Sequence, residues 1–194
     1  VILADAQGTL LQALGDAGFA QRAERVALRP GANWHEQWRG TNAIGTALAD
    51  GESVVVHGGE HYLERNGFLT CTAAPVTDSA GSVVGVLDIS GDHRGYHRHT
   101  LALVRLAART VEQKLFDARH AGGLRLRLHA QPEGIGSVSE GLLALSEDGS
   151  LSGANAAALA MLGITRAHAG ARRGAQPSEP AAGLRFQPAL PPRE

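Results

Sequence analysis

The stretch at residues 40–48, GTNAIGTAL, carries two Gly-Thr pairs five residues apart, and it could form a phosphate-binding loop, a helix cap or the rim of a pocket. A Walker-type phosphate loop needs glycine-rich backbone amides followed by Lys and Ser or Thr. Lys114, the one lysine of the chain, instead follows Gln113 inside an expected helix. The glycines also have the wrong spacing for a dinucleotide fingerprint. The remaining interpretations are a helix entry capped by Thr41 or Asn42, or the rim of a pocket.

The histidines show no metal-binding pattern. His57 and His61 are four residues apart, but the two glycines between them argue against one shared helix face. The loop histidines at 93, 97 and 99 could form a zinc site with Cys71. Solvated loop side chains are the favoured interpretation, because the sequence has no cysteine pair and no HExxH motif. We expect no metal site.

Nucleophile chemistry has one candidate, the single cysteine Cys71. A reactive thiol needs a positive neighbour, yet Cys71 lies in the strand-like FLTCTAAPV, where a lone cysteine is usually a small buried hydrophobe. No GxSxG elbow and no paired carboxylates occur. Asp88, in an apolar strand, is either a pocket residue or a strand-end carboxylate bonded to nearby backbone. We therefore expect neither an enzyme nor a cofactor.

Trp34 and Trp38 flank His-Glu-Gln and are four residues apart, so that at helical spacing they share one face. Large aromatic side chains beside a glycine-rich rim are common in small-ligand pockets. They are equally common as core residues, and both interpretations stay open.

Strands and helices are indicated by period and by turn residues. Strands are expected at 1–4, 9–11, 53–57, 68–76 and 82–90, the last two joined as a hairpin. Helices are expected at 16–28, 41–49 and 100–119. The third carries an apolar stripe formed by Leu101, Val104, Ala108, Val111 and Leu115, with Thr100 as its N-cap. After a glycine pair, a strand at 124–130, a strand-turn-strand at 141–152 and a helix at 155–162 follow.

Composition limits the functions that the chain can have. It has 194 residues, 43% of them hydrophobic, and a formal net charge of −1, which argues against a strong nucleic-acid-binding field. No apolar run approaches the roughly 20 residues that span a bilayer. The first residues lack the pattern of a signal peptide. We expect a cytoplasmic fragment of a longer protein.

Several motifs occur together in a fixed order: W-x-E at Trp34, GTNAIGTAL, Glu-His-aromatic around His61, C-x-AAP at Cys71, and GVLDISG around Asp88. Over residues 1–120 this series resembles the sensory GAF domain of bacterial sigma-54-dependent, Fis-type transcriptional activators, in particular the acetoin catabolism regulators. EGLLALSEDGSLSGANAAALAMLGI, within residues 121–164, resembles the opening of the PAS-like segment that follows the GAF domain in those proteins.

The resemblance implies an α+β fold, with a GAF-type antiparallel sheet, flanking helices and a ligand cavity under a covering segment. It implies a GAF domain at 1–120 and a partial PAS-like α/β segment at 121–164. Residues 165–194 do not resemble the family, and their Ala, Gly, Arg and Pro content predicts a disordered tail. The family's AAA+ ATPase and helix-turn-helix are not in this sequence, so we expect no direct DNA binding by it.

The implied function is signal sensing. A small organic metabolite of the ketone, alcohol, aldehyde or phenol class would bind the GAF cavity, and a homodimer would form through the 100–119 helix. The cyclic-nucleotide GAF signature is absent. The alternatives are a dimerisation or partner-docking module without a ligand and, with less support, a Cys71-based redox sensor or reductase. By the resemblance, the candidate residues that line or support the pocket are Trp34, Glu36, Thr41, Asn42, His61 and Cys71.

Overall fold

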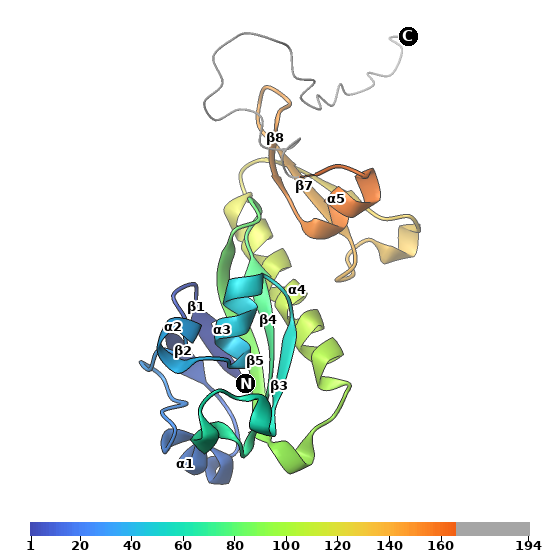
Figure 1. The fold of residues 1–194 in the computed structure, drawn as a ribbon. Coiled ribbons are helices and arrows are strands. Elements are labelled where there is room, and N and C mark those ends of the chain that lie inside the picture. Colours follow the sequence, from blue (N-terminus) through green and yellow to red (C-terminus); the bar gives the residue numbers. More distant parts are fainter. Residues whose placement is uncertain (166–194) are drawn as a thin grey trace, which may run out of the picture. The chain divides into compact units, whose positions relative to one another are not determined.

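The computed structural model describes residues 1–165, which form two compact units (Figure 1). The first unit consists of Val1–Thr77 and Val83–Val111. The second consists of Asp78–Ser82 and, among the described residues, 112–165. Apart from Thr165, the tail expected to be disordered, residues 165–194, lies outside the described residues.

The first unit is built on a five-stranded antiparallel sheet with strand order β2-β1-β5-β4-β3. Its two longest strands, β4 and β5, are the expected hairpin. Asp88 in the middle of β5 is paired with Ile2 on one side and Ala73 on the other, and Ser90 is opposite Cys71. The strands are β1 (Ile2–Asp5), β2 (Leu10–Ala13), β3 (Val54–His57), β4 (Leu69–Thr77) and β5 (Val83–Asp92).

One face of this sheet carries the main core and the short helices α1 (Ala17–Glu24), α2 (Glu36–Arg39) and α3 (Ala43–Asp50). Helix α3 packs on β4 and β5 (Figure 1). Side chains alternate along a strand, so Cys71 and Ala73 of β4 face this core together with Val86, Asp88 and Ser90 of β5. The 3₁₀ turns η1 (Gly58–Glu60) and η2 (Glu64–Asn66) connect β3 to β4.

The other face is covered by α4 (Thr100–Arg119), which follows the 3₁₀ turn η3 (His93–Gly95). The predicted helix range is confirmed, and the predicted N-cap Thr100 is its first helical residue. The expected apolar stripe packs on the sheet with Leu101, Val104, Ala108 and Val111, while Leu115 is 42% exposed. Most of that stripe therefore packs against the sheet of the same chain and is not exposed.

The second unit contains a three-stranded antiparallel sheet of order β6-β7-β8 and one short helix, α5 (Ala156–Leu162). Its central strand is buried at every position, and Asn155 caps α5 by accepting a hydrogen bond from the amide of Ala158. The strands are β6 (Leu124–Leu128), β7 (Gly141–Leu145) and β8 (Leu151–Ala154), with a 3₁₀ turn, η4 (Pro132–Gly134), after β6. Taken together, the two sheets and their helices confirm the α+β class.

Helix α1 is shorter than the expected 16–28 and ends at Glu24. Ala27 is left-handed at φ 59°, a conformation that few non-glycine residues adopt. The Trp34 indole Nε1 donates a 2.9 Å hydrogen bond to the Ala27 carbonyl. The amides of Ala27 and Leu28 donate to the carbonyls of Glu24 and Ala23, so the helix closes in a left-handed C-terminal cap, and Trp34 binds the carbonyl of that cap. Among residues 1–165, no helix combines the length and apolar character needed to span a bilayer.

Candidate functional site

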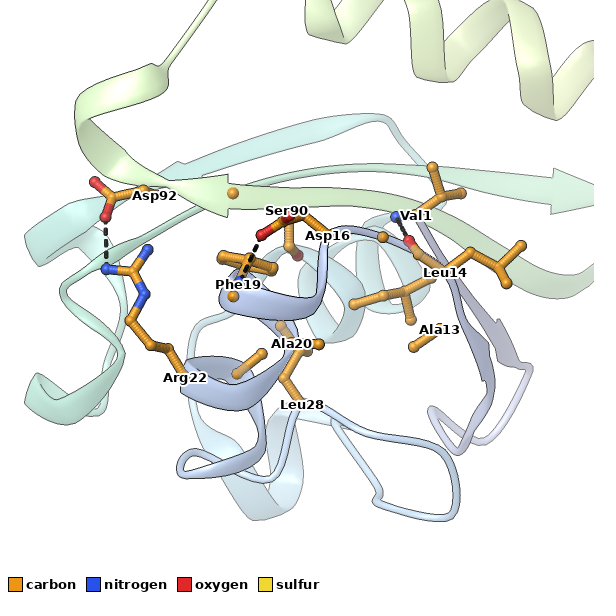
Figure 2. A pocket seen from close by; sticks show the side chains of 15 residues that line it. Val1, Ala13, Leu14, Asp16, Phe19, Ala20, Arg22, Leu28, Ser90 and Asp92 are labelled. Carbon is orange, nitrogen blue, oxygen red and sulfur yellow. Dashed lines mark hydrogen bonds and ion pairs between the residues drawn. The ribbon is translucent and has the colours of Figure 1, made fainter.

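A pocket of about 520 Å³ lies between α1 and the core-facing side of the five-stranded sheet (Figure 2). This volume lies in the range of roughly 300–1,000 Å³ that is typical of small-molecule sites. Its walls are mostly apolar and come from β1, β2, α1 and the segment after α1: Ile2, Ala13, Leu14, Phe19, Ala23 and Leu28. Its polar side chains are Asp16, Arg22, Ser90 and Asp92.

Helix α1, which covers this pocket, has few anchors. Its N-cap is Asp16, whose Oδ1 accepts a 2.9 Å hydrogen bond from the amide of Phe19. Of its eight residues only Ala23 is buried. A helix this short depends on tertiary contacts, because isolated helices below about 12 residues are marginal in water. Helix α1 is therefore a cover held at a small number of points.

One of those points is an ion pair with the end of β5. Arg22 extends from α1 so that its Nη1 lies 2.8 Å from Oδ2 of Asp92 (Figure 2). The Arg22 guanidinium also lies 5.5 Å from the ring centroid of Phe68. Hydrogen bonds from Arg94 and from Arg22 hold the pKa of Asp92 well below its usual range. The carboxylate of Asp92 therefore stays charged and joins α1 to the sheet.

A chain of buried polar groups begins at the pocket wall. Ser90 lines the pocket, and its Oγ donates a hydrogen bond to Oδ2 of Asp88 and lies 3.2 Å from Sγ of Cys71. Asp88 is fully buried, and its Oδ1 has no hydrogen-bond partner. Burial raises the pKa of Asp88 to about 7, although the Ser90 hydrogen bond acts in the opposite direction. The neutral carboxylic acid is accordingly well populated near neutral pH.

The same surroundings make Cys71 a poor nucleophile. Burial, together with the neighbouring Asp88 carboxyl, raises the pKa of the Cys71 thiol well above its usual range. The thiol is buried and forms no disulfide. A protonated, inaccessible thiol lacks the thiolate character that redox and nucleophilic chemistry need, which argues against the Cys71-based alternatives.

The residues predicted from GTNAIGTAL organise the start of α3. Asn42 is its N-cap: Oδ1 accepts a 2.9 Å hydrogen bond from the Gly45 amide. Its Nδ2 donates to the carbonyls of Trp34 and Gly40, at 2.9 and 2.8 Å. Asn42 is fully buried, and these backbone groups occupy its side chain, whereas Thr41 is exposed.

The glycines of this motif allow close packing. A Cβ on Gly45 would lie 2.6 Å from the backbone nitrogen of Glu36, and a Cβ on Gly40, whose φ is 64°, would meet the ring of Tyr62 at 2.3 Å. The Glu36 carboxylate accepts a hydrogen bond from the Thr46 hydroxyl. GTNAIGTAL is thus a helix entry fitted against α2.

The six predicted site residues do not form one cluster. Trp34, Glu36 and Asn42 lie together at the start of α3, as described above. His61 is buried in the connection from β3 to β4; its Nδ1 donates to the Gly58 carbonyl at 2.9 Å, Nε2 is unpartnered, and burial lowers its pKa. None of the six is among the described residues that line the pocket under α1, but Cys71 contacts it through Ser90.

The lining residues Phe19, Arg22, Ser90 and Asp92 were not singled out from the sequence. The sequence does carry an indication for Ser90. It follows Asp88 by two positions in a predicted strand, so both side chains lie on the same face of the sheet. Asp88 bonds the Ser90 side chain and not nearby backbone. Within residues 1–165 no group of three or more His, Cys, Asp or Glu side chains is arranged to hold a metal ion.

A model of the GAF domain family matches residues 1–115. The acetoin catabolism regulatory protein of Cupriavidus necator is 37% identical over 169 residues, which are 84% of this chain and 25% of that protein. The acetoin dehydrogenase operon transcriptional activator AcoR of Bacillus subtilis is 39% identical over 114 residues, 59% of this chain and 19% of that protein. The chain therefore spans a quarter or less of each relative, and both names are those of regulators, not of enzymes.

A similar fold occurs in the solved structure of the E. coli DhaR(N)–DhaL complex, with a TM-score of 0.58 and 21% identity over 90% of this chain and 59% of that one. At this identity the likeness concerns the fold alone. The family match covers more than half of the chain, and the relatives confirm the resemblance drawn from the motifs. The chain belongs to the GAF domain family and is homologous to the acetoin catabolism regulators.

Proposed function

We propose that this chain is the signal-sensing region of a sigma-54-dependent transcriptional activator, and that a small organic effector binds in the pocket under α1. The observation that carries the proposal is the pocket of about 520 Å³ in the GAF domain, with apolar walls and a few polar side chains. This combination is typical of small-molecule sites. A role in transcription also implies a cytoplasmic location.

The proposed effector is a ketone, alcohol, aldehyde or phenol. Phe19 and Leu28 offer an apolar wall, and Ser90 offers a hydroxyl that donates and accepts hydrogen bonds. The names of the two relatives make acetoin, a small hydroxyketone, the first compound to test.

The six residues chosen from the sequence enter this proposal as pocket-supporting positions. Trp34 holds the turn after α1 through Ala27, and Asn42 holds the backbone of Trp34. Cys71 lies behind Ser90. Glu36, Thr41 and His61 would act further from the effector, around the start of α3 and the connection that precedes β4.

Effector binding would act by shifting the populations of two arrangements of the domain that bind the effector with different affinity. Helix α4 is the proposed relay, since it covers the other face of the same sheet. A homodimer through α4 would use its outward side chains, because Leu103 and Leu106 are 57% and 47% exposed whereas most of the predicted stripe is packed on the sheet. The ATPase and DNA-binding output would belong to the rest of the activator.

The test is a thermal-shift screen of the whole chain with small ketones, diols, aldehydes, phenols and carboxylates. A ligand that binds only the native state stabilises it by about 2.7 kcal/mol at 100 times its Kd. Ala20 lines the pocket from α1, so Ala20→Phe should abolish the shift; Ala17→Phe is the matched control, because Ala17 is exposed on the same helix and outside the pocket lining. A shift that survives in Ala20→Phe would place the binding site elsewhere.

A partner-docking module is the second candidate. One observation favours it: the solved structure of similar fold is a DhaR(N)–DhaL complex, in which that protein was crystallised with a partner. The absence of a thermal shift with every compound class would favour this candidate over an effector site.

A further inference from the structure

The buried carboxyl of Asp88 lies beside the pocket without the partners that a buried charge requires. None of the ion pairs formed by residues 1–165 includes it. Its one hydrogen bond comes from Ser90, and its second oxygen has none. An unpaired buried carboxylate costs several kcal/mol, so such a group takes up a proton instead. Burial accordingly raises the pKa of Asp88 to about 7.

The state of Asp88 decides what Ser90 can offer to the pocket. A serine hydroxyl has one proton to donate and two lone pairs that accept. An ionised Asp88 takes that proton, which leaves Ser90 as an acceptor only. A neutral Asp88 can donate its own proton to Oγ, which frees the Ser90 hydrogen for a group in the pocket. The Cys71 sulfur, 3.2 Å from Oγ, competes only as a weak acceptor.

On the basis of the proposed effector site, we propose that Ser90 contacts the oxygen of the effector. Asp88 is then the positioning residue that turns the Ser90 hydroxyl toward the pocket. The pocket would then select small uncharged carbonyl or hydroxyl compounds over carboxylates of the same size.

Carboxylates are disfavoured for two reasons. Arg22 is the one cationic side chain among the described lining residues, and it is already paired with Asp92. The other cationic group of the lining, the α-ammonium of Val1, donates a 2.6 Å hydrogen bond to the Leu14 carbonyl. A carboxylate beside Ser90 would also lie close to Asp88, so once Asp88 is ionised the two negative charges repel each other. A neutral oxygen meets neither cost and can accept the freed hydroxyl proton.

Burial raises the pKa of Asp88 to about 7, and the positive charge of the Val1 α-ammonium, which also lines the pocket, acts to lower that pKa. Ile2 of β1 and Ile44 and Ala47 of α3 are apolar. The pKa of the Cys71 thiol is raised and that of Asp92 is lowered, both away from neutral pH. The charged or titratable side chains that line the pocket or contact Ser90 are Cys71 on β4, Asp16 and Arg22 at α1, and Asp92 on β5.

The test compares two probes of similar size, acetoin and the lactate anion, by calorimetric titration of the 194-residue chain. We expect acetoin to bind at least about 10-fold more tightly than lactate. Ser90→Ala should weaken acetoin binding about 10-fold, and Ser90→Thr should restore it, because threonine keeps the hydroxyl.

The pH profile separates a positioning role for Asp88 from a merely structural one. Acetoin binding to the unchanged chain should weaken as pH rises through about 7, when the Asp88 carboxylate takes the Ser90 proton. Asp88→Asn keeps a group that donates to Ser90, so it should bind acetoin with no such pH dependence. Asp50→Asn, at an exposed carboxylate at the end of α3, is the charge-matched control and should behave like the unchanged chain.

The outcomes distinguish this inference from the proposed function. Lactate binding as tightly as acetoin, acetoin binding unchanged in Ser90→Ala, or the same pH profile in Asp88→Asn would each overturn the inference. If only a phenol or a carboxylate binds, and Ala20→Phe abolishes that binding, the inference falls while the effector site stands. If no compound class binds, both fall.

Discussion

Replacing Asp88 by Asn should change how the stability of the GAF domain depends on pH. The carboxyl is fully buried, and its pKa is raised from an ordinary value of 3.8 to about 7. The folded chain therefore keeps the Asp88 proton to higher pH than the unfolded chain does. The free energy of unfolding consequently falls as pH rises from about 4 to about 7 and levels off above that range.

The magnitude follows from the shift. A difference of about three pKa units corresponds to roughly 4 kcal/mol at 1.36 kcal/mol per unit. Histidines act in the opposite direction, because burial lowers the pKa values of His61 and His120. Their contributions are lost as pH falls below about 6.5, and they are the same in both variants. The difference between Asp88→Asn and the unchanged chain isolates Asp88.

The assay is urea unfolding followed by Trp34 fluorescence in a Trp38→Phe background, at several values between about pH 4.5 and pH 8. Trp34 is 1% exposed in the core of the first unit, whereas Trp38 is 71% exposed. Trp34 emission therefore reports the unit that contains Asp88. The stability of Asp88→Asn relative to the unchanged chain should increase by up to about 4 kcal/mol over this range. If the free energies of unfolding of Asp88→Asn and of the unchanged chain varied with pH in parallel, a neutral, buried Asp88 would be refuted.

Three further predictions concern the segment around α3, and urea unfolding measures each. Asn42→Ala removes the cap of α3 and two hydrogen bonds to backbone, so it should cost about 2–3 kcal/mol; Asn42→Ser keeps an uncharged capping oxygen and should fall between the unchanged chain and Asn42→Ala. Gly45→Ala should destabilise by about 1–3 kcal/mol, although alanine gains about 1 kcal/mol in helix propensity, because the new Cβ meets the Glu36 backbone; a stabilised variant would contradict this packing. Trp34→Phe should cost about 1–2 kcal/mol, because it leaves the Ala27 carbonyl without the indole hydrogen bond. Ala27→Gly should instead raise the free energy of unfolding, because glycine adopts the left-handed φ without strain. Destabilisation of the same size by both changes would contradict these two predictions.

The sheet and the long helix follow from the sequence because their signals are local. Two apolar runs joined by a Gly-containing turn indicate the β4–β5 hairpin, and the stripe with helical period indicates α4 through Arg119. The end of α1 does not follow, because its left-handed cap lies at Ala27, a residue type that rarely adopts this conformation, and Trp34 contacts that cap only in the fold. Single-sequence patterns carry no information on such a contact.

The pocket was harder to predict, since its parts are distant along the chain. Arg22 and Asp92 are 70 residues apart and meet only in the fold. Residue type was also ambiguous for Asn42, because a buried polar side chain in a motif can serve a ligand or the backbone. The structure shows Asn42 bonded to backbone on all sides. The motifs identified the family and contain the lining residue Ser90, whereas the apolar pocket walls come from residues outside those motifs.

The central claim, an effector site under α1, is tested most directly by amide NMR spectra of the isotope-labelled chain titrated with acetoin. The account predicts shifts that saturate with ligand and are largest at Phe19, Ala23 and Ser90, and that vanish in Ala20→Phe but persist in Ala17→Phe. Shifts centred on other residues, or shifts unchanged by Ala20→Phe, would contradict it.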